Sequence, residues 1–261
     1  MKGASFFLLP FSFIVAACAP VPAPQVFPFS VSPALVLVTW NMHGDAGDLE
    51  RLVADLRAGR LTGGIEPRHF VLLLQEARHE ARTDGLFTFF APARRVCDVE
   101  RGNAILSTLP LVNARAIELP RERQRRVAAV ASVRVDSQEL LIVNVHLENR
   151  ASWWKGGLPG DLARARQMDA LLAQLPPTPG VLGGDLNIWL GTRERAYQAA
   201  VGRFPDLTDP PPITFRERLT LDHLLFRLPP SWMASARPAA SRYGSDHYPV
   251  IGWLWALGSG R

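Results

Sequence analysis

The sequence predicts an α/β protein in which mixed β-sheets are covered by helices. Short apolar runs rich in valine, isoleucine and leucine alternate with helical patterns from about residue 34 onwards. Two of these runs follow each other closely enough to form a hairpin, and the hydrophobic (48%) and charged (20%) fractions are typical of a globular protein. The runs expected to be strands are Ala34–Trp40, Phe70–Leu74, Ala104–Leu106, Val127–Val135, Leu140–Leu147, Val181–Leu182, Leu221–Phe226 and Pro249–Leu254.

The N-terminal segment has the pattern of an export signal over residues 1–18. Lys2 precedes an apolar run from Phe6 to Ala17, which is shorter than the roughly 20 apolar residues needed to span a bilayer. The alternative, a buried first element of the fold, is disfavoured because residues 19–33 contain recurring prolines and no hydrophobic period. We therefore expect a signal peptide, a proline-rich linker over residues 19–33, and one catalytic domain over residues 34–261.

The tetrapeptide Val15-Ala16-Ala17-Cys18 resembles the lipobox of bacterial lipoproteins. The resemblance implies that Cys18 is acylated and becomes the new N-terminus, so that a lipid anchors the protein to a membrane of the bacterial cell envelope, facing the periplasm or the exterior. If Cys18 carries the lipid, Cys97 is the only other cysteine and no intramolecular disulfide forms. No nucleophile signature surrounds Cys97, which favours an unreactive thiol.

Three helices are expected between the strands. The segment 46–58 places Leu49, Leu52, Val53 and Leu56 at the i, i+3, i+4, i+7 spacing of one helix face. The segment 161–175 shows the same spacing of apolar residues, and a third helix is expected over residues 192–201.

The segment 127–147 contains the expected hairpin. Its two strand-like runs meet near Asp136-Ser137-Gln138, and aspartate and serine are common turn residues. A hairpin makes its sheet at least partly antiparallel, which argues against a purely parallel, doubly wound fold.

The charge of the chain permits a phosphate-bearing substrate without selecting one. The net charge is +5, and of 29 lysines and arginines only Lys2 and Lys155 are lysine. Guanidinium groups suit bidentate phosphate contacts, although a genome rich in G and C would explain most of the arginine excess by codon usage alone.

Several strand-like runs end in residues suited to bind a metal, a water or a phosphate. One such ending is uninformative, since loops are polar and each residue alone is more often a turn, cap or surface residue. Repeated endings favour a shared active edge. The endings are Asn41, Gln75-Glu76, His146, Asp185-Leu186-Asn187, Asp222 and Asp246-His247.

The residue types at these ends indicate a hard cation. Carboxylate and amide oxygens without a cysteine cluster suit Mg²⁺ or Mn²⁺ and argue against structural zinc. Glu76 is the best single metal ligand, Asn41 offers an amide oxygen, and Asp246 is able to complete the set. Asp185 and Asn187 are two residues apart, so in an extended segment both face one side and hold a water or a phosphate oxygen.

The acid–base candidate is His247, because imidazole titrates near neutral pH. As a general base it needs an orienting carboxylate, for which Asp222 is the candidate, and His146 would hydrogen-bond a phosphate oxygen or assist the leaving group. The remaining histidines, His43, His69, His79 and His223, are interpreted as structural or exposed.

Taken in order, these segments resemble the endonuclease/exonuclease/phosphatase superfamily. The residues that carry the resemblance are Thr39-Trp40-Asn41, Leu74-Gln75-Glu76, Gly102-Asn103-Ala104-Ile105-Leu106-Ser107, Asn144-Val145-His146-Leu147, Gly184-Asp185-Leu186-Asn187, Leu221-Asp222-His223 and Ser245-Asp246-His247. The resemblance implies a four-layer sandwich, two mixed sheets flanked by helices, with the site along one edge. It also implies the roles given above, and an arginine that grips phosphate, for which Arg125 or Arg126 is the candidate.

The function expected from the residues and the resemblance is Mg²⁺-dependent hydrolysis of phosphodiesters or phosphomonoesters. The basic balance favours nucleic acid, as does the pair Trp153-Trp154, which would stack bases, cover the site, dip into lipid headgroups or pack in the core. Alternatives are a lipid or small-molecule phosphoesterase and an inactive surface-binding lipoprotein. The intact set of candidate residues argues against the inactive protein.

Overall fold

The computed structural model describes residues 32–44, 46–81, 83–149, 160–207 and 212–257. The expected signal peptide with Cys18, the linker up to residue 31, and Trp153-Trp154 lie outside the described residues. Within the described ranges, no helix combines the length and the apolar character needed to cross a membrane.

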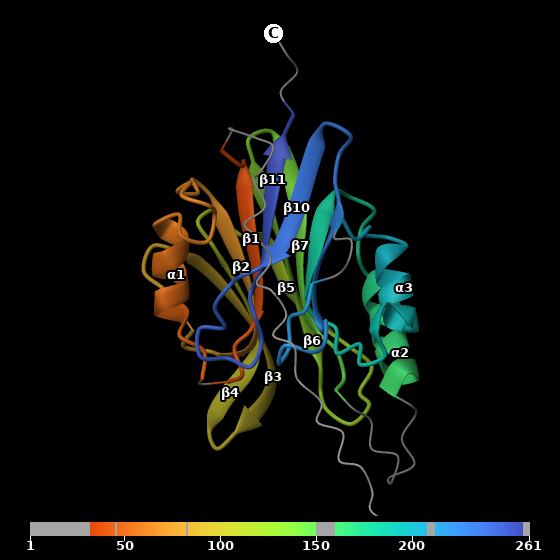
Figure 1. Ribbon diagram of the computed structural model, residues 1–261. Coiled ribbons are helices and arrows are strands. Elements are labelled where there is room, and N and C mark those ends of the chain that lie inside the picture. The colour runs from red at the N-terminus through yellow and green to blue at the C-terminus, as the bar shows by residue number, and fades with distance from the viewer. Residues whose placement is uncertain (1–31, 45, 82, 150–159, 208–211, 258–261) are drawn as a thin grey trace, which may run out of the picture. The chain divides into compact units, whose positions relative to one another are not determined.

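The domain is built on two mixed sheets, which confirms the predicted fold class. Helices flank them as outer layers, with α1 on one side and α2 and α3 on the other (Figure 1). The helices are α1 (Leu49–Arg57), α2 (Gly160–Leu172) and α3 (Arg195–Val201). The six-stranded sheet has the order β10 (Trp232–Pro238), β11 (Val250–Ala256), β1 (Leu35–Asn41), β2 (Phe70–Arg78), β4 (Val99–Ser107) and β3 (Phe87–Val96). The five-stranded sheet has the order β5 (Val112–Glu118), β6 (Val127–Val135), β7 (Gln138–His146), β8 (Gly180–Asp185) and β9 (Asp222–Arg227).

Helix α1 forms where the sequence pattern predicts it, and its start is fixed by a cap. All four apolar residues of the predicted face are buried. The side chain of Asp48 accepts a hydrogen bond from the backbone N–H of Arg51 at 3.0 Å, which satisfies a free donor of the first turn. The helix therefore begins at Leu49, three residues after the start of the predicted segment.

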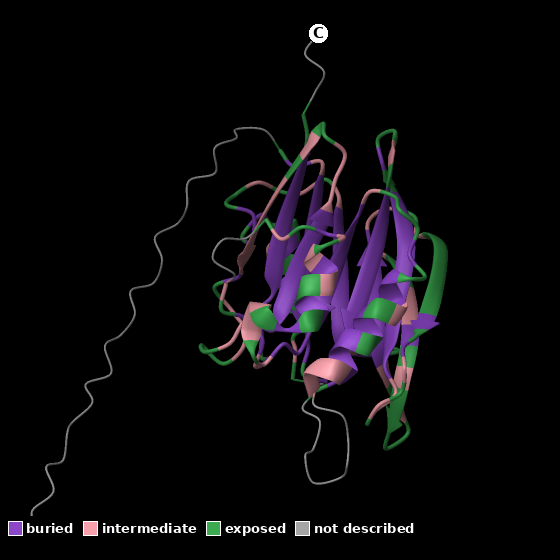
Figure 2. Cartoon of the chain, turned by 90° about the vertical axis from the view of Figure 1, so that its right-hand side faces the viewer, coloured by how far each residue is buried: buried purple, intermediate pink, exposed green. Residues whose placement is uncertain are grey.

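Two of the hydrophobic layers that hold the sandwich together lie against the five-stranded sheet. One lies between the sheets and includes Leu37, Leu73 and Val181, and the other lies between the five-stranded sheet and the helices α2 and α3, where Met168 and Phe204 are buried. Figure 2 shows the strands buried along most of their length, with exposed residues on the outer helix faces and on an edge strand. This burial is the main stabilising contribution to the fold.

A buried polar network joins the two sheets directly behind the polar strand ends. The Nε2 group of Gln75 donates to Oδ1 of Asn144 at 2.7 Å and to Oγ1 of Thr39 at 3.0 Å. Asn144 in turn donates to the backbone oxygens of Leu74 and Ala104 at 2.9 and 2.8 Å. Because buried amides are costly to leave unpaired, this network fixes how β2 and β7 face each other.

The hairpin of β6 and β7 is confirmed. The strands pair antiparallel up to Val135 opposite Gln138, and Asp136 in the turn has a φ of 53°. Among the described residues the structure also contains three strands that the apolar runs do not predict, namely β3, β5 and β10, and each is the edge strand of its sheet.

Candidate active site

The first half of the site is a row of three side chains across neighbouring strands of the five-stranded sheet. His146 at the end of β7 is the register partner of Asp185 at the end of β8, and Asp185 is the partner of Asp222 at the start of β9. Gly184 permits this close pairing, because a Cβ at that position would lie 1.8 Å from the backbone oxygen of Val145. Three positions far apart in sequence therefore become direct neighbours.

The second half comes from the six-stranded sheet. Asn41 at the end of β1 is the register partner of Gln75, and Glu76 follows in a bulge, where the pairing of β2 with β4 shifts and the φ of Glu76 is 53°. The Nδ2 group of Asn41 donates to Oδ2 of Asp185 at 2.9 Å, so the two halves meet at this contact. A positive φ in a non-glycine residue at a strand end is the kind of strain found at functional sites.

His247 is held against β1 by backbone contacts. Its backbone oxygen accepts from Nε1 of Trp40 at 3.2 Å, and its N–H donates to Oγ of Ser245, whose hydroxyl donates to the oxygen of Asn41 at 2.6 Å. The ring of Phe215 packs on the imidazole with the ring centroids 4.7 Å apart. The loop before β11 therefore holds His247 at a fixed place beside Asp185 and Asp222.

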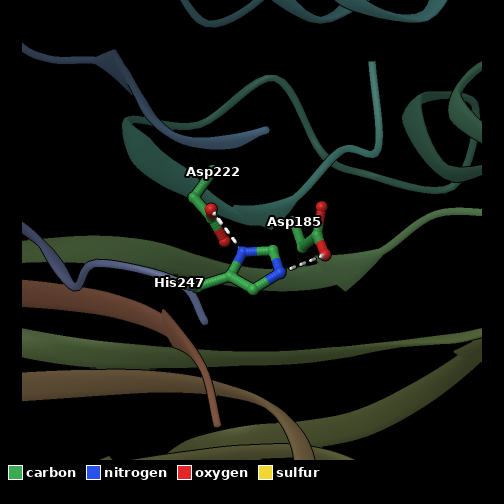
Figure 3. A group of neighbouring side chains, drawn as sticks. All are labelled: Asp185, Asp222 and His247. Carbon is green, nitrogen blue, oxygen red and sulfur yellow. Dashed lines mark hydrogen bonds and ion pairs between the residues drawn. The ribbon is translucent and has the colours of Figure 1, made fainter. Parts of the chain in front are cut away.

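The imidazole of His247 lies between two buried carboxylates (Figure 3). Its Nδ1 is 2.7 Å from Oδ2 of Asp222, and its Nε2 is 3.9 Å from Oδ2 of Asp185. Burial alone would lower the pKa of His247, but the charge and hydrogen bond of Asp222, with the charges of Asp185 and Asp246, raise it to about 9. The ring of His247 is thus held against Asp222, and its raised pKa keeps both ring nitrogens protonated at neutral pH.

Asp185 is the most perturbed carboxyl of the row. Burial, and next the charge of Asp222, raise its pKa to about 6, against the opposing effects of His247 and of hydrogen bonds from Asn41 and Asn187. The backbone N–H of Asn187 donates to Oδ1 of Asp185 at 2.9 Å, and the amide of Asn187 donates to the backbone oxygen of Leu147 at 3.2 Å. The pKa of the Asp185 carboxyl therefore lies close to neutrality, in the range that acid–base catalysis requires.

His146 and Arg126 supply a neutral and a cationic donor beside the row. Burial, and then the positive charges of Arg126, His247 and Arg94, hold the pKa of His146 well below its usual value, so His146 is neutral. Arg126 is only 8% exposed, and its Nε has no hydrogen-bond partner. A buried donor of this kind without a partner is rare in a folded protein, which suggests a place for an anion.

Glu76, His146 and Arg126 line one pocket together with Arg94, whose Nη2 lies 3.7 Å from Oε2 of Glu76. Arg125 also lines the pocket, but its guanidinium is bound to both carboxylate oxygens of Glu118 at 3.1 Å. Of the two arginines considered from the sequence, Arg126 is the one whose Nε has no acceptor.

Two of the expected metal ligands, Asn41 and Asp246, both contact His43. The Oδ1 atom of Asn41 accepts from the backbone N–H of His43 at 3.0 Å, and the Nδ1 of His43 lies 3.2 Å from Oδ1 of Asp246. The other oxygen of Asp246 accepts from Arg216. Asn41 therefore retains one lone pair on its amide oxygen, and both carboxylate oxygens of Asp246 have partners.

Two parts of the described site offer ligand atoms that suit a hard cation. The carboxylate of Glu76 already forms an ion pair with Arg94. Carboxylate oxygens are the ligands that Mg²⁺ or Mn²⁺ prefers. Ligand atoms of Asp185, Asp222 and His247 also lie within 4.8 Å of one another, and the Oδ1 of Asp222 is buried without a partner. In this second cluster, however, Asp222 and His247 already bind each other, which leaves fewer free ligand atoms.

Sequence reasoning did not identify two side chains of the site. Arg94 lies on β3, an edge strand that the apolar pattern does not reveal, and Phe215 lies in the irregular segment before β9. Phe215 reaches His247 through an isolated backbone bridge, for which the sequence carries no recognisable signal.

A family model agrees with this geometry. The model of the Endonuclease/Exonuclease/phosphatase family matches residues 38–247, which include every described candidate residue above. No curated protein matches the chain in sequence.

Solved structures are similar in fold. The human Nocturnin catalytic domain with bound sulfate is similar with a TM-score of 0.64 and 21% identity, covering 86% of this chain and 95% of that one. The D. rerio TDP2 with a single-strand DNA product gives a TM-score of 0.60 and 18% identity, covering 84% and 98%. Sphingomyelinase C from Streptomyces griseocarneus gives 0.53 and 19%, covering 84% and 98%. At these identities the likeness shows the shared fold.

Proposed function

Because this chain belongs to the endonuclease/exonuclease/phosphatase family, we propose that it is a metal-dependent phosphoesterase that uses Mg²⁺ or Mn²⁺. The observation that carries the proposal is the meeting of Asn41 from one sheet with Asp185 from the other, at 2.9 Å. Through this contact, Glu76 and the histidines share one edge of the sandwich. Such an edge brings a cation ligand, an acid–base pair and phosphate donors to one substrate group.

The phosphate to be cleaved would be held by one arginine and by the two histidines of the site. Arg126 offers a buried cationic donor, and the neutral His146 offers one ring N–H. His247 adds a second cationic donor through Nε2. These groups face negative charge that grows on the phosphoryl oxygens as water attacks, and fixed donors in a buried place stabilise it strongly.

The proton of the attacking water would go to Asp185, the carboxylate that faces His247. Sequence reasoning alone assigns the base to His247. An imidazolium, however, is protonated on both ring nitrogens and has no free nitrogen to accept another proton. Asp185, with its pKa near 6, is ionised at pH 7 and faces the Nε2 of both His146 and His247, at 3.6 and 3.9 Å. We therefore assign proton acceptance to Asp185 and phosphate binding to His247.

Glu76 is the principal cation ligand in this proposal, and Asn41 and Asp246 are the further candidate ligands. A divalent cation held there would neutralise charge on a phosphoryl oxygen. Asn41 also fixes Asp185 by its hydrogen bond, so one side chain would link the cation to the proton acceptor.

Nucleic acid is the substrate class that we favour, because the chain has a net charge of +5 and the site contains several arginines. One similar structure, a TDP2, holds a single-strand DNA product. A lipid or small-molecule phosphoester is the alternative, since another similar structure is a sphingomyelinase.

The function is tested by a substrate panel of plasmid DNA, bis-p-nitrophenyl phosphate, sphingomyelin and inositol phosphates, each with Mg²⁺ and with EDTA. We expect hydrolysis that EDTA abolishes and added Mg²⁺ or Mn²⁺ restores. Activity that survives EDTA would exclude the metal mechanism. If no substrate turns over, the inactive binding lipoprotein becomes the better hypothesis.

The rate should follow a bell-shaped pH profile. Below about pH 6 Asp185 is protonated and accepts no proton, and above about pH 9 His247 loses the charge that binds phosphate. A bound divalent cation shifts both limbs to lower pH. His247→Gln should remove the alkaline limb. A wild-type rate that keeps rising as His247 loses its proton would return the role of base to His247.

We also propose that the chain is an exported lipoprotein, with a lipid on Cys18 and residues 19–33 as a spacer before the catalytic domain at 34–261. The sequence features of residues 1–33 support this organisation. Cys18→Ser should move the protein out of the membrane fraction of the cell envelope. An unchanged distribution would contradict the anchor.

A further inference from the structure

Glu148 is a buried carboxylate to which the mechanism above gives no role. It lies two residues after His146, and 0% of its surface is exposed. Its oxygens accept backbone hydrogen bonds: the N–H groups of Arg123 and Gln124 donate to Oε2 at 3.1 and 2.9 Å, and that of Asn149 donates to Oε1 at 3.1 Å. Because a buried carboxylate is costly unless its oxygens are bonded, these contacts fix the side chain and its partners together.

The segment that Glu148 holds is the β5–β6 loop (residues 119–126), which ends at Arg126. The loop contains no helix or strand, and its two ends are joined by a hydrogen bond from the N–H of Leu119 to the backbone oxygen of Arg126 at 3.0 Å. The two loop N–H groups that bind Glu148 belong to the residues two and three positions before Arg126. Glu148 therefore fixes the backbone that leads directly into Arg126.

Helix α2 fixes Glu148 and the start of the same loop. The Oε1 atom of the buried Gln167 accepts from the N–H of Glu148 at 2.8 Å, and its Nε2 group donates to the backbone oxygen of Pro120 at 3.0 Å. One turn earlier, Arg164 donates to the backbone oxygen of Glu148 at 3.3 Å and to the carboxylate of Glu194 at 2.7 Å. A buried polar network whose members are paired in this way specifies one arrangement of the segments that it joins.

The charge of Glu148 also acts on Arg126. Burial lowers the pKa of Arg126, and the charge of Glu148 is the first of the opposing effects, ahead of those of Asp185 and Glu76. By Coulomb's law alone, however, a fixed negative charge near Arg126 should weaken the binding of a phosphate there. The tether and the charge therefore have opposite effects on phosphate affinity, and a measurement of that affinity separates them.

We propose that Glu148 is a positioning residue, which holds the β5–β6 loop so that the guanidinium of Arg126 faces the phosphate before the phosphate binds. This inference rests on the proposed function, since phosphate is the group that Arg126 would bind. A donor that is already in place stabilises developing charge without reorganisation, and its supporting contacts decide how well it is placed. Loss of the tether should therefore weaken phosphate binding, although it removes a negative charge.

The test titrates inorganic phosphate into the EDTA-treated, full-length protein and measures its affinity by calorimetry. Glu148→Gln should weaken the binding about fivefold or more, within the range of coupling between residues of one network. Glu148→Asp keeps the charge but withdraws the carboxylate by one methylene, so it should cause a similar loss. The matched control is Asp206→Asn, the same carboxylate-to-amide change at a side chain that is 8% exposed, accepts from the hydroxyl of Tyr197 and does not line the pocket. This control should keep the wild-type affinity.

A double-mutant cycle shows whether Glu148 acts through Arg126. Arg126→Gln should itself weaken phosphate binding about tenfold or more, since it removes a charged hydrogen-bond donor. Adding Glu148→Gln to Arg126→Gln should then change the affinity less than about twofold, because the group that Glu148 positions is already gone. If the second substitution weakens binding as much as it does in the wild type, Glu148 does not act through Arg126 and the inference is wrong.

Wild-type or tighter phosphate binding by either folded Glu148 variant would also overturn the positioning role, as would a wild-type protein that binds no phosphate. Amide hydrogen exchange of the wild type tests the tether even if the variants do not fold. The amides of Arg123 and Gln124 should exchange more slowly than that of the exposed Arg121 in the same loop, and equal rates would contradict the tether.

Phosphate binding in EDTA requires neither a cation nor turnover, so the two proposals fail separately. Hydrolysis in the substrate panel without coupling between Glu148 and Arg126 would refute only the positioning role. Coupling without hydrolysis of any substrate would refute only the proposed function.

Discussion

Asp185→Asn is expected to lower kcat on bis-p-nitrophenyl phosphate by about 10²- to 10⁴-fold, the range typical of a lost general base. His247→Ala is expected to lower kcat by about 10²- to 10³-fold, the range typical of a lost fixed donor to the transition state. His247 lies between the carboxylates of Asp185 and Asp222, and nothing else in the described row replaces either its charge or the acceptor on Asp185. The effect should fall on kcat more than on KM, because the lost interactions strengthen as the transition state forms.

Folding is checked separately, because His247→Ala leaves Asp222 buried without its partner. His247→Gln fills the same space with a neutral donor, and circular dichroism with thermal melting reports whether either variant folds. His79→Ala is the matched control, since His79 is exposed and lies outside the site. A folded His247 or Asp185 variant with kcat within threefold of wild type would remove that residue from the mechanism.

Glu76→Gln is expected to lower the rate about 10³-fold at low Mg²⁺ concentration, since a bound cation contributes several kcal/mol of charge stabilisation. Part of the loss should return as the Mn²⁺ concentration is raised, because Asn41 and the substrate phosphate still offer oxygens. Rates measured across a cation titration give both the affinity and the maximum. Glu100→Gln, an exposed carboxylate on β4, is the control.

If Glu76→Gln shows the wild-type dependence on cation concentration, Glu76 is not a ligand. The cluster of Asp185, Asp222 and His247 would then be the remaining candidate for the cation among the described residues.

The central part of each sheet was predictable from the sequence. Buried strands need apolar residues on both faces, and runs such as Leu35–Trp40 and Val127–Val135 therefore stand out. The edge strands β3, β5 and β10 were not predictable in this way. β5 buries only Ile117, and β3 contains Pro92 and two arginines, features that protect a sheet edge against aggregation and also hide it from apolar periodicity.

The site was predictable where it follows from strand ends. Asn41, Glu76, His146, Asp185 and Asp222 all stand at or near the ends of strands that the apolar runs predict, and parallel or antiparallel pairing brings such ends together. The placement of the arginines was not. Four arginines lie between residues 121 and 126, and the sequence does not show which of them points into the site. Arg125 contacts Glu118 and Arg126 points inward because of the register of β5 and β6. The protonation states of Asp185 and His247 could not be predicted either, since they depend on burial and on neighbouring charges from other strands.

The most direct test of the account is the position of the cation. Crystals grown with Mn²⁺ should show an anomalous scattering peak at bonding distance from the carboxylate of Glu76, on the same edge as Asp185 and His247. If the ion lies instead among Asp185, Asp222 and His247, or nowhere near Glu76, the proposed division into cation ligand and acid–base pair is wrong.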